Sequence, residues 1–246
     1  GKLKPRAVMP VDLFGQTADY RVLEPIIRRE NLKMLCDAAQ GFGGLLDGRR
    51  SGGIGDAAAT SFFPAKPLGC FGDGGASFTN DDGLADLLRS IRIHGQGTDK
   101  YENVRIGVNS RLDTIQAAIL IEKLKIFPEE IEMRETVARR YSSALSRSNR
   151  IGVPRVIEGA QSTWAQYTIQ VPDRAKLQAD LKAKEIPTAV YYPIPLSRQK
   201  GYREFPSAPI PVSEKLSKTV VSLPMHPYLD AATQDRIIEA VSESVQ

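Results

Sequence analysis

Short apolar runs alternate with helical segments along the first third of the chain. Buried strands are predicted at residues 7–11 and 33–36, and the segment between them, 19–31, carries apolar side chains at helical spacing. Two further strands are predicted at residues 57–62 and 76–79, separated by a loop rich in glycine and proline. Because strand–helix–strand units build parallel sheets covered by helices, the pattern predicts an α/β domain.

A long helical pattern follows this first domain. One helix is predicted to begin after Asp81 as its N-cap, and a second helical stretch covers residues 111–145. The apolar face predicted for the second stretch comprises Leu112, Ile115, Ala118, Ile119 and Leu124. Pro128 predicts a break or kink near Phe127, and the length of the stretch suits a link between two domains.

The remaining residues have the pattern of a smaller α/β unit. The predicted elements are strands at 165–171, 188–191 and 220–223, and helices at 174–184 and from Ala231 onward. We therefore expect two domains, a large one at residues 1–148 that includes the linking helix and a small C-terminal one at residues 149–246.

Charge and cysteine content narrow the class of protein. The 246 residues carry 33 Lys and Arg against 29 Asp and Glu, a net charge of +4, and the basic residues are scattered rather than gathered in a run. No nucleic-acid partner is expected from that pattern. The two cysteines, Cys36 and Cys70, lie in apolar stretches and are predicted to be packing residues in a reducing compartment. With no apolar run as long as a membrane span, we expect a cytoplasmic protein that does not engage a membrane.

An aspartate and a lysine stand out from the strand pattern. Asp37 follows a buried strand directly, where a carboxylate is costly unless something cationic meets it, although a helix N-cap is the common reason for such an aspartate. Lys66 lies between two prolines in an apolar loop, a setting that favours the neutral amine, although most lysines are simply solvated. Together they suit pyridoxal-phosphate (PLP) chemistry, in which a lysine binds the aldehyde and a carboxylate keeps the ring nitrogen protonated.

Three motifs make a resemblance specific. DAAQGFG begins at Asp37, SFFPAKPLGCFGDGGA spans residues 61–76, and GVNSRLDTIQAAIL spans residues 107–120. In this order and at these separations they resemble the DegT/StrS-type sugar aminotransferases, whose fold is PLP fold type I, the aspartate aminotransferase-like fold. The likeness continues through TAVYYPIPL and SLPMHPYL. It implies an α/β fold with an incomplete large domain around a mixed, mostly parallel sheet, and a small C-terminal α/β domain.

The resemblance implies a role for each matching residue. Lys66 would be the Schiff-base lysine and proton carrier, Asp37 the partner of the pyridine nitrogen, and Gln40 a hydrogen-bond donor near the cofactor's phenolic oxygen. Ser61 would contact the phosphate, and Asn109 the phosphate of a neighbouring subunit's cofactor. A homodimer with shared active sites is therefore expected.

The implied reaction is a ping-pong transfer of an amino group from an amino acid, glutamate being the usual donor, to a nucleotide-linked keto-sugar. The subgroup most similar in motif aminates a UDP-linked 3-keto-N-acetylglucosaminuronic acid for bacterial surface polysaccharide such as O-antigen. Tyr191 and Tyr192 fall where that subgroup contacts the nucleotide, although a His-Tyr pair is more familiar there. The alternative for both rings is packing against the proline-rich loop. His94 is a candidate for the substrate entrance.

The family's phosphate-binding Gly-Thr loop and the aromatic residue that stacks on the cofactor do not occur in this sequence. We therefore expect a C-terminal portion of a longer enzyme, with an exposed sheet edge or apolar face near Met9. An inactive fragment or paralogue that acts as an interaction subunit, and a PLP-dependent sugar dehydratase, remain alternatives. Without a Cys/His cluster at ligand spacing, no metal site is expected.

Overall fold

The computed structural model describes residues 4–245 and divides the chain into two compact units. The first comprises Gly1–Ile131 with Val156–Ala165, and the second comprises Glu132–Arg155 with Gln166–Gln246. These units do not test whether residues 1–148 and 149–246 form two domains, so that division stays a prediction.

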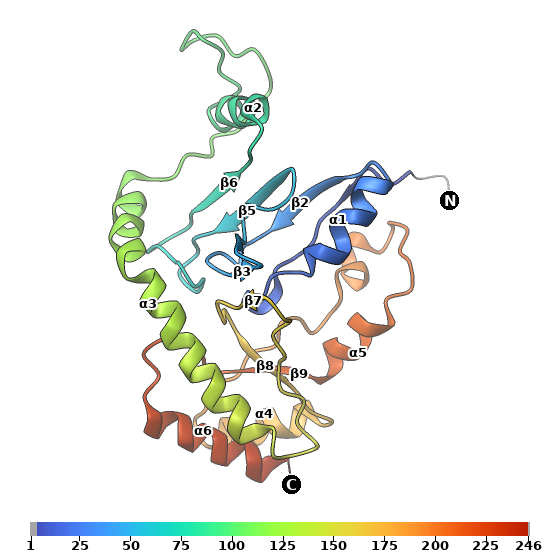
Figure 1. Ribbon diagram of the computed structural model, residues 1–246, viewed down its shortest axis with the longest axis vertical. Coiled ribbons are helices and arrows are strands. Elements are labelled where there is room, and N and C mark those ends of the chain that lie inside the picture. The colour runs from blue at the N-terminus through green and yellow to red at the C-terminus, as the bar shows by residue number, and fades with distance from the viewer. Residues whose placement is uncertain (1–3, 246) are drawn as a thin grey trace. The chain divides into compact units, whose positions relative to one another are not determined.

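A four-stranded sheet lies at the centre of the first unit, in the order β1 (Ala7–Val8), β2 (Lys33–Asp37), β5 (Ala57–Ser61) and β6 (Gly75–Phe78) (Figure 1). The first three strands run parallel, and β6 is antiparallel to β5. The predicted mixed, mostly parallel sheet is confirmed. Since β2 and β5 are parallel neighbours, their carboxyl ends lie at the same edge of the sheet.

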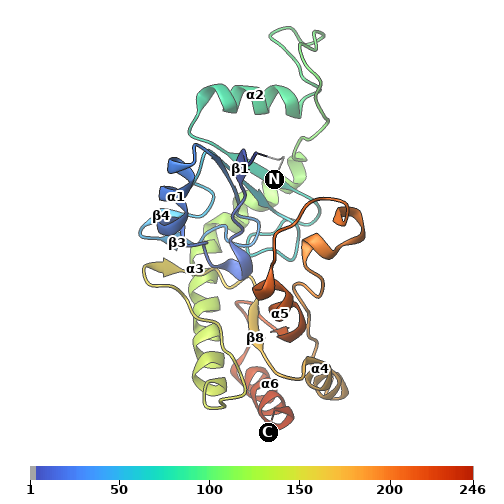
Figure 2. The same cartoon turned by 90° about the vertical axis from the view of Figure 1, so that its right-hand side faces the viewer.

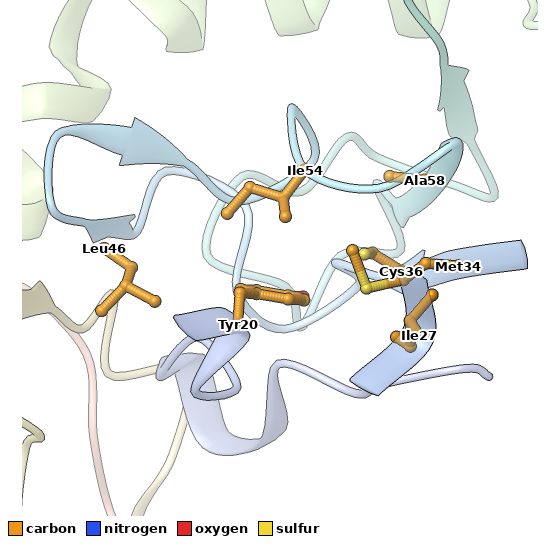
Figure 3. Close-up of a cluster of buried hydrophobic side chains, with 7 residues drawn as sticks. All are labelled: Tyr20, Ile27, Met34, Cys36, Leu46, Ile54 and Ala58. Atoms are coloured by element: carbon orange, nitrogen blue, oxygen red, sulfur yellow. The ribbon is translucent and has the colours of Figure 1, made fainter. Parts of the chain in front are cut away.

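Helix α1 (Tyr20–Arg29) packs on this sheet through one side. The buried cluster beneath it, drawn in Figure 3, comprises Tyr20, Ile27, Met34, Cys36, Leu46, Ile54 and Ala58. Val22 and Ile26, which the helical spacing included in the apolar face, are exposed. The buried face of α1 is therefore narrower than the sequence predicted, and Tyr20, Leu23 and Ile27 make the contact.

One edge of the sheet is formed by β1, which pairs with β2 and with no other strand of residues 4–245. The sequence predicted an exposed edge or apolar face near Met9, and the Met9 side chain is 61% exposed. A short 3-10 helix, η1 (Leu13–Gly15), follows and leads into α1.

A second, smaller sheet in the first unit was not predicted. It consists of β3 (Leu45–Leu46), β4 (Arg49–Arg50) and β7 (Ala160–Gln161), in the antiparallel order β4-β3-β7. Strands of two residues carry no readable alternation, so the sequence pattern gives no signal for them.

Helix α2 (Asp82–Arg92) begins where predicted, because the Asp81 side chain accepts a hydrogen bond from Leu84 N at 2.9 Å. No residue of α2 is buried, and both views draw it apart from the four-stranded sheet (Figure 1 and Figure 2). The chain after α2 folds back on itself through antiparallel bridges that pair Ile93 with Asn109 and Gln96 with Asn103. We call residues 93–109 the hairpin segment.

Helix α3 (Thr114–Leu145) runs without interruption from the first unit into the second. Of the break or kink predicted near Phe127, the break does not occur, since Pro128 lies inside the helix; the kink stays a prediction. Proline removes one backbone donor, but Phe127 and Ile131 on either side of it are buried in an apolar cluster. That packing offsets the missing hydrogen bond.

The buried face of α3 also differs from the predicted one. Its first four turns bury Leu120 and then Phe127, whereas Ile115 and Leu124 are exposed. Apolar residues occur on more than one side of this helix, so spacing alone does not identify the packed side.

The second unit pairs β8 (Tyr167–Gln170) with β9 (Val220–Leu223) in an antiparallel sheet. Its helices are α4 (Arg174–Ala183), α5 (Pro211–Thr219) and α6 (Ala231–Ser244), with 3-10 turns η2 (Leu196–Arg198) and η3 (Lys200–Tyr202). The predicted strand at 188–191 is wrong: only Ala189 forms a bridge, with Ser222. Helix α5 was not predicted, since the proline-rich texture before it indicated a loop.

Candidate active site

Asp37 and Ser61 end two adjacent parallel strands. Asp37 pairs in register with Ala59, two residues before the end of β5. The contact continues past the strand, because Ala38 N donates to Ala59 O at 2.8 Å and Thr60 Oγ1 donates to Ala38 O at 3.2 Å. The two strand ends are therefore held together at the carboxyl edge, where α/β folds bind ligands.

The Asp37 carboxylate is half-buried and only partly engaged. Its Oδ1 accepts a hydrogen bond from Ala39 N at 2.9 Å, while Oδ2 accepts none from residues 4–245. Turns rather than a helix follow it, so the alternative that Asp37 caps a helix does not apply. One carboxylate oxygen thus remains for a donor outside the described chain.

Gln40 is buried and fixed by the backbone. Its Oε1 accepts from Phe14 N at 2.6 Å, and its carbonyl oxygen accepts from Thr163 Oγ1 at 2.9 Å. Because Phe14 N donates to Oε1, the oxygen of the Gln40 side-chain amide is the acceptor and its Nε2 is the donor.

Lys66 lies on a turn in the loop that joins β5 to β6. Its backbone N donates to Phe63 O at 2.8 Å, and its half-buried side chain makes no hydrogen bond or ion pair with residues 4–245. At the start of the same loop, Ser61 Oγ accepts from Phe63 N at 3.2 Å. The amine is therefore not committed to a structural partner in the described chain.

Two further predicted residues lie in the hairpin segment. His94 is exposed with a φ of 58°, and its N donates to Val108 O at 3.0 Å. Asn109 is also exposed and forms the bridge with Ile93. No hydrogen bond joins either residue to Asp37 or Lys66, so their predicted roles at the substrate entrance and at a neighbour's phosphate stay predictions.

Tyr191 and Tyr192 belong to the second unit. Their ring centroids are 5.6 Å apart in a T-shaped arrangement, and Tyr192 is exposed. The predicted contact of this pair with a nucleotide stays a prediction.

Both cysteines are buried and neither forms a disulfide, which confirms that they pack. Burial raises the pKa of the Cys36 thiol. Within residues 4–245, no group of three or more His, Cys, Asp or Glu side chains is placed to hold a metal ion. In the same range no helix has the length and apolarity needed to cross a membrane.

Asp12 is the site-adjacent residue that the sequence reasoning missed. The side chain is fully buried, Oδ1 accepts from Tyr20 OH at 2.6 Å and Ala18 N at 2.9 Å, and Oδ2 accepts from Ser51 Oγ. Its backbone N donates to Asp37 O at 2.9 Å. Asp12 follows the first strand region as Asp37 follows the second, and this shared position at a strand end was the available signal.

Burial raises the pKa of Asp12 above its ordinary value of 3.8, although the bonds from Ser51, Tyr20 and Ala18 oppose that rise. Between the unfolded and the folded pKa, Asp12 therefore binds more protons in the folded protein than in the unfolded chain. The stability that Asp12 contributes is thus greatest below pH 3.8 and falls as pH rises through the folded pKa.

We expect the unfolding free energy of the wild type minus that of Asp12→Asn to fall as pH rises above 3.8 towards the folded pKa of Asp12, because asparagine does not titrate. Urea unfolding at several pH values measures it. Asp56→Asn is the control: Met34 N and Lys33 lower the pKa of Asp56, so its difference should be level above about pH 4.5. A level or rising difference for Asp12→Asn would contradict the assignment.

Comparison with known proteins gives the geometry a context. The model of the DegT/DnrJ/EryC1/StrS aminotransferase family matches residues 2–242. A Pseudomonas aeruginosa relative, UDP-2-acetamido-2-deoxy-3-oxo-D-glucuronate aminotransferase, is 48% identical over 239 residues, covering 97% of this chain and 66% of the relative. This chain spans only 64–66% of the length of five of the curated relatives that it matches, the Pseudomonas aeruginosa protein among them.

Solved structures agree with this likeness. A DegT DnrJ EryC1 StrS aminotransferase from Brucella abortus is 51% identical with a TM-score of 0.96, covering 100% of this chain and 66% of that one. NtdA from Bacillus subtilis, solved with bound cofactor PMP, is 30% identical with a TM-score of 0.86, covering 99% and 57%.

Proposed function

The chain belongs to the DegT/DnrJ/EryC1/StrS aminotransferase family, and on that premise we propose that it carries the PLP-binding lysine and aspartate of an enzyme that aminates a nucleotide-linked keto-sugar. One observation carries the proposal. Asp37 ends β2, and Lys66 lies in the loop that follows the neighbouring parallel strand β5, at the same edge of the sheet. Within residues 4–245 the Lys66 amine makes no hydrogen bond or ion pair, and Asp37 Oδ2 accepts no hydrogen bond.

The residues present fit PLP in their chemistry. A carboxylate that retains an open acceptor suits a protonated pyridine nitrogen, and a lysine without an ion-pair partner suits a group that must lose its proton to react. Ser61 supplies a hydroxyl and Gln40 an amide donor at the same strand ends. Bound PLP would supply an aldehyde that condenses with amines and a ring that withdraws electrons.

The chain's own residues would perform distinct steps. The Lys66 Nζ would hold the cofactor covalently and, once the incoming substrate amine has displaced it, would carry a proton between the substrate Cα and the cofactor carbon that bore the aldehyde. The Asp37 carboxylate would keep the ring nitrogen protonated, and Ala39 N orients that carboxylate. The Gln40 amide would donate to the phenolic oxygen, and the hydrogen bond from Phe14 N to Gln40 Oε1 holds that amide in place.

For the substrate, we propose a UDP-linked 3-keto-N-acetylglucosaminuronic acid. The proposed donor is an amino acid, and glutamate is the usual donor in this family. The name of the Pseudomonas aeruginosa relative supports this choice. Tyr191 and Tyr192 would contact the nucleotide and His94 would lie at the substrate entrance. The product would feed bacterial surface polysaccharide such as O-antigen, with synthesis in the cytoplasm.

Mass spectrometry of products tests the substrate class. The full-length protein would be incubated with PLP, glutamate and a panel of UDP- and dTDP-linked keto-sugars. We expect an aminated UDP-sugar as the main product. A dehydrated sugar, or no aminated product with any sugar of the panel, would contradict the proposal.

We also propose that two copies of this chain form a dimer through α2 and the hairpin segment. Ile106 is 98% exposed and Tyr101 is 87% exposed, and no residue of α2 is buried. Exposed apolar side chains gathered on one part of a chain favour a partner surface. Asn109, the residue expected to reach a neighbouring cofactor, lies in the same segment.

Ile106→Asp is expected to shift the chain from dimer to monomer, because burying a carboxylate in an apolar interface costs its hydration. Sedimentation equilibrium measures the shift, and a rise in the dimer dissociation constant of about tenfold or more is expected. Val212→Asp changes an exposed apolar residue of the second unit and should leave the dimer unchanged. Equal behaviour of the two variants would contradict this interface.

A further inference from the structure

Helix α3 holds the loop that carries Lys66 through two polar side chains. Gln116 Oε1 accepts a hydrogen bond from Phe71 N at 2.8 Å, and Lys123 Nζ donates to Gly69 O at 2.5 Å. Gln116 and Lys123 are about two helical turns apart, so they lie on the same face of α3. Both bonds reach backbone atoms of the loop between β5 and β6.

The backbone of the loop connects these two hydrogen bonds to Lys66, because Gly69 packs closely against the backbone of residues 63 and 64. At Gly69 a Cβ atom would lie 2.6 Å from Pro64 O and 2.7 Å from Phe63 O. Phe63 O is also the acceptor for Lys66 N. Fixing Gly69 therefore fixes the turn on which Lys66 is carried.

An apolar cluster lies between the same loop and the same helix. It comprises Phe62, Leu68 and Cys70 from the loop with Leu120, Phe127 and Ile131 from α3. Hydrophobic contact is non-directional, so it sets how closely the loop packs but not which way the lysine points. The two hydrogen bonds are directional and supply that orientation.

Lys123 differs from an ordinary surface lysine of this helix. It has no carboxylate partner within residues 4–245 and instead binds a carbonyl while its Nζ lies 5.9 Å from the centre of the Phe71 ring. Lys125, by contrast, forms an ion pair with Glu122 of the same helix at 2.7 Å. The half-buried Lys123 ammonium is thus committed to the Lys66 loop.

We propose that Gln116 and Lys123 are positioning residues that hold Lys66 in the orientation from which its amine reacts. The proposal rests on the function proposed above, in which Lys66 forms the covalent bond to PLP. Neither residue touches the reacting atoms, and both act through the backbone of residues 69–71.

Hydrogen exchange of the chain without PLP tests whether the contacts order the loop. In Gln116→Leu and Lys123→Met we expect amide exchange of residues 62–75 to rise about two- to tenfold, as the loss of one hydrogen bond allows. Gln116→Glu keeps the acceptor and Lys123→Arg keeps the donor, so both should restore slow exchange. Lys125→Met is the matched control and should exchange like the wild type.

The rate at which PLP becomes fixed to Lys66 by borohydride tests the consequence for reactivity. We expect the two disrupting variants to label more slowly by a similar factor, with unchanged melting temperatures, and the two conservative variants to label normally. Exchange or labelling like the wild type in both disrupting variants would overturn the positioning role. If the wild type itself takes up no PLP, the proposed function fails and the positioning role fails with it, whatever the exchange data say about loop order.

Discussion

Lys66→Arg is expected to abolish transamination, with a fall in kcat/KM of more than about 10³-fold. Arginine keeps the charge and approximate length of the side chain, but its guanidinium stays protonated in proteins and forms no imine with an aldehyde. Product formation measured by mass spectrometry checks this. Lys125→Arg is the control, since Lys125 only pairs with Glu122 on the surface of α3.

The loss should not come from unfolding. The Lys66 side chain has no hydrogen bond or ion pair within residues 4–245, so its replacement removes no described polar contact. We expect a melting temperature within a few degrees, about the effect of a fraction of a kcal/mol. Activity above about a tenth of the wild-type value in Lys66→Arg would contradict the role of this lysine.

Asp37→Asn is expected to lower kcat by about 10²- to 10⁴-fold while leaving PLP attached to Lys66. Asparagine can still accept the hydrogen bond from Ala39 N, so local geometry is preserved. It carries no charge, however, and cannot keep the ring nitrogen protonated. Activity and borohydride labelling, measured on the same variant, separate the two effects.

Asp56→Asn is the matched control for Asp37→Asn. Asp56 accepts from Met34 N at 2.8 Å, at the opposite end of β2 from Asp37. Its replacement should lower stability slightly and leave kcat unchanged. A loss of labelling in Asp37→Asn, or equal losses of kcat in both variants, would contradict the assigned role.

The strand ends were the part of the site that the sequence could predict. Asp37 follows an apolar run and Lys66 lies in an apolar loop, and both patterns are local in the chain. Asp12 was not found, because its importance comes from Tyr20, Ser51 and the backbone of Asp37, which only folding brings together. Buried polar networks join distant residues and leave little pattern in the sequence.

Helix α3 shows a similar limit. Its existence followed from helical spacing, but its packed side did not, since tertiary contact selects among several apolar stripes. The prediction at Pro128 considered only the backbone N–H that proline lacks. In the structure the helix continues through Pro128, where Phe127 and Ile131 are buried in an apolar cluster. No sequence pattern indicated Gln116 and Lys123, because their hydrogen-bond partners lie in a loop far away in the chain. Gln116 accepts from Phe71 N, and Lys123 donates to Gly69 O.

The most direct measurement is peptide mapping of the wild-type full-length protein after incubation with PLP and reduction with borohydride. A covalent pyridoxyl adduct is predicted on the peptide that contains Lys66. The absence of any adduct, or an adduct only on another lysine such as Lys123, would contradict the assignment.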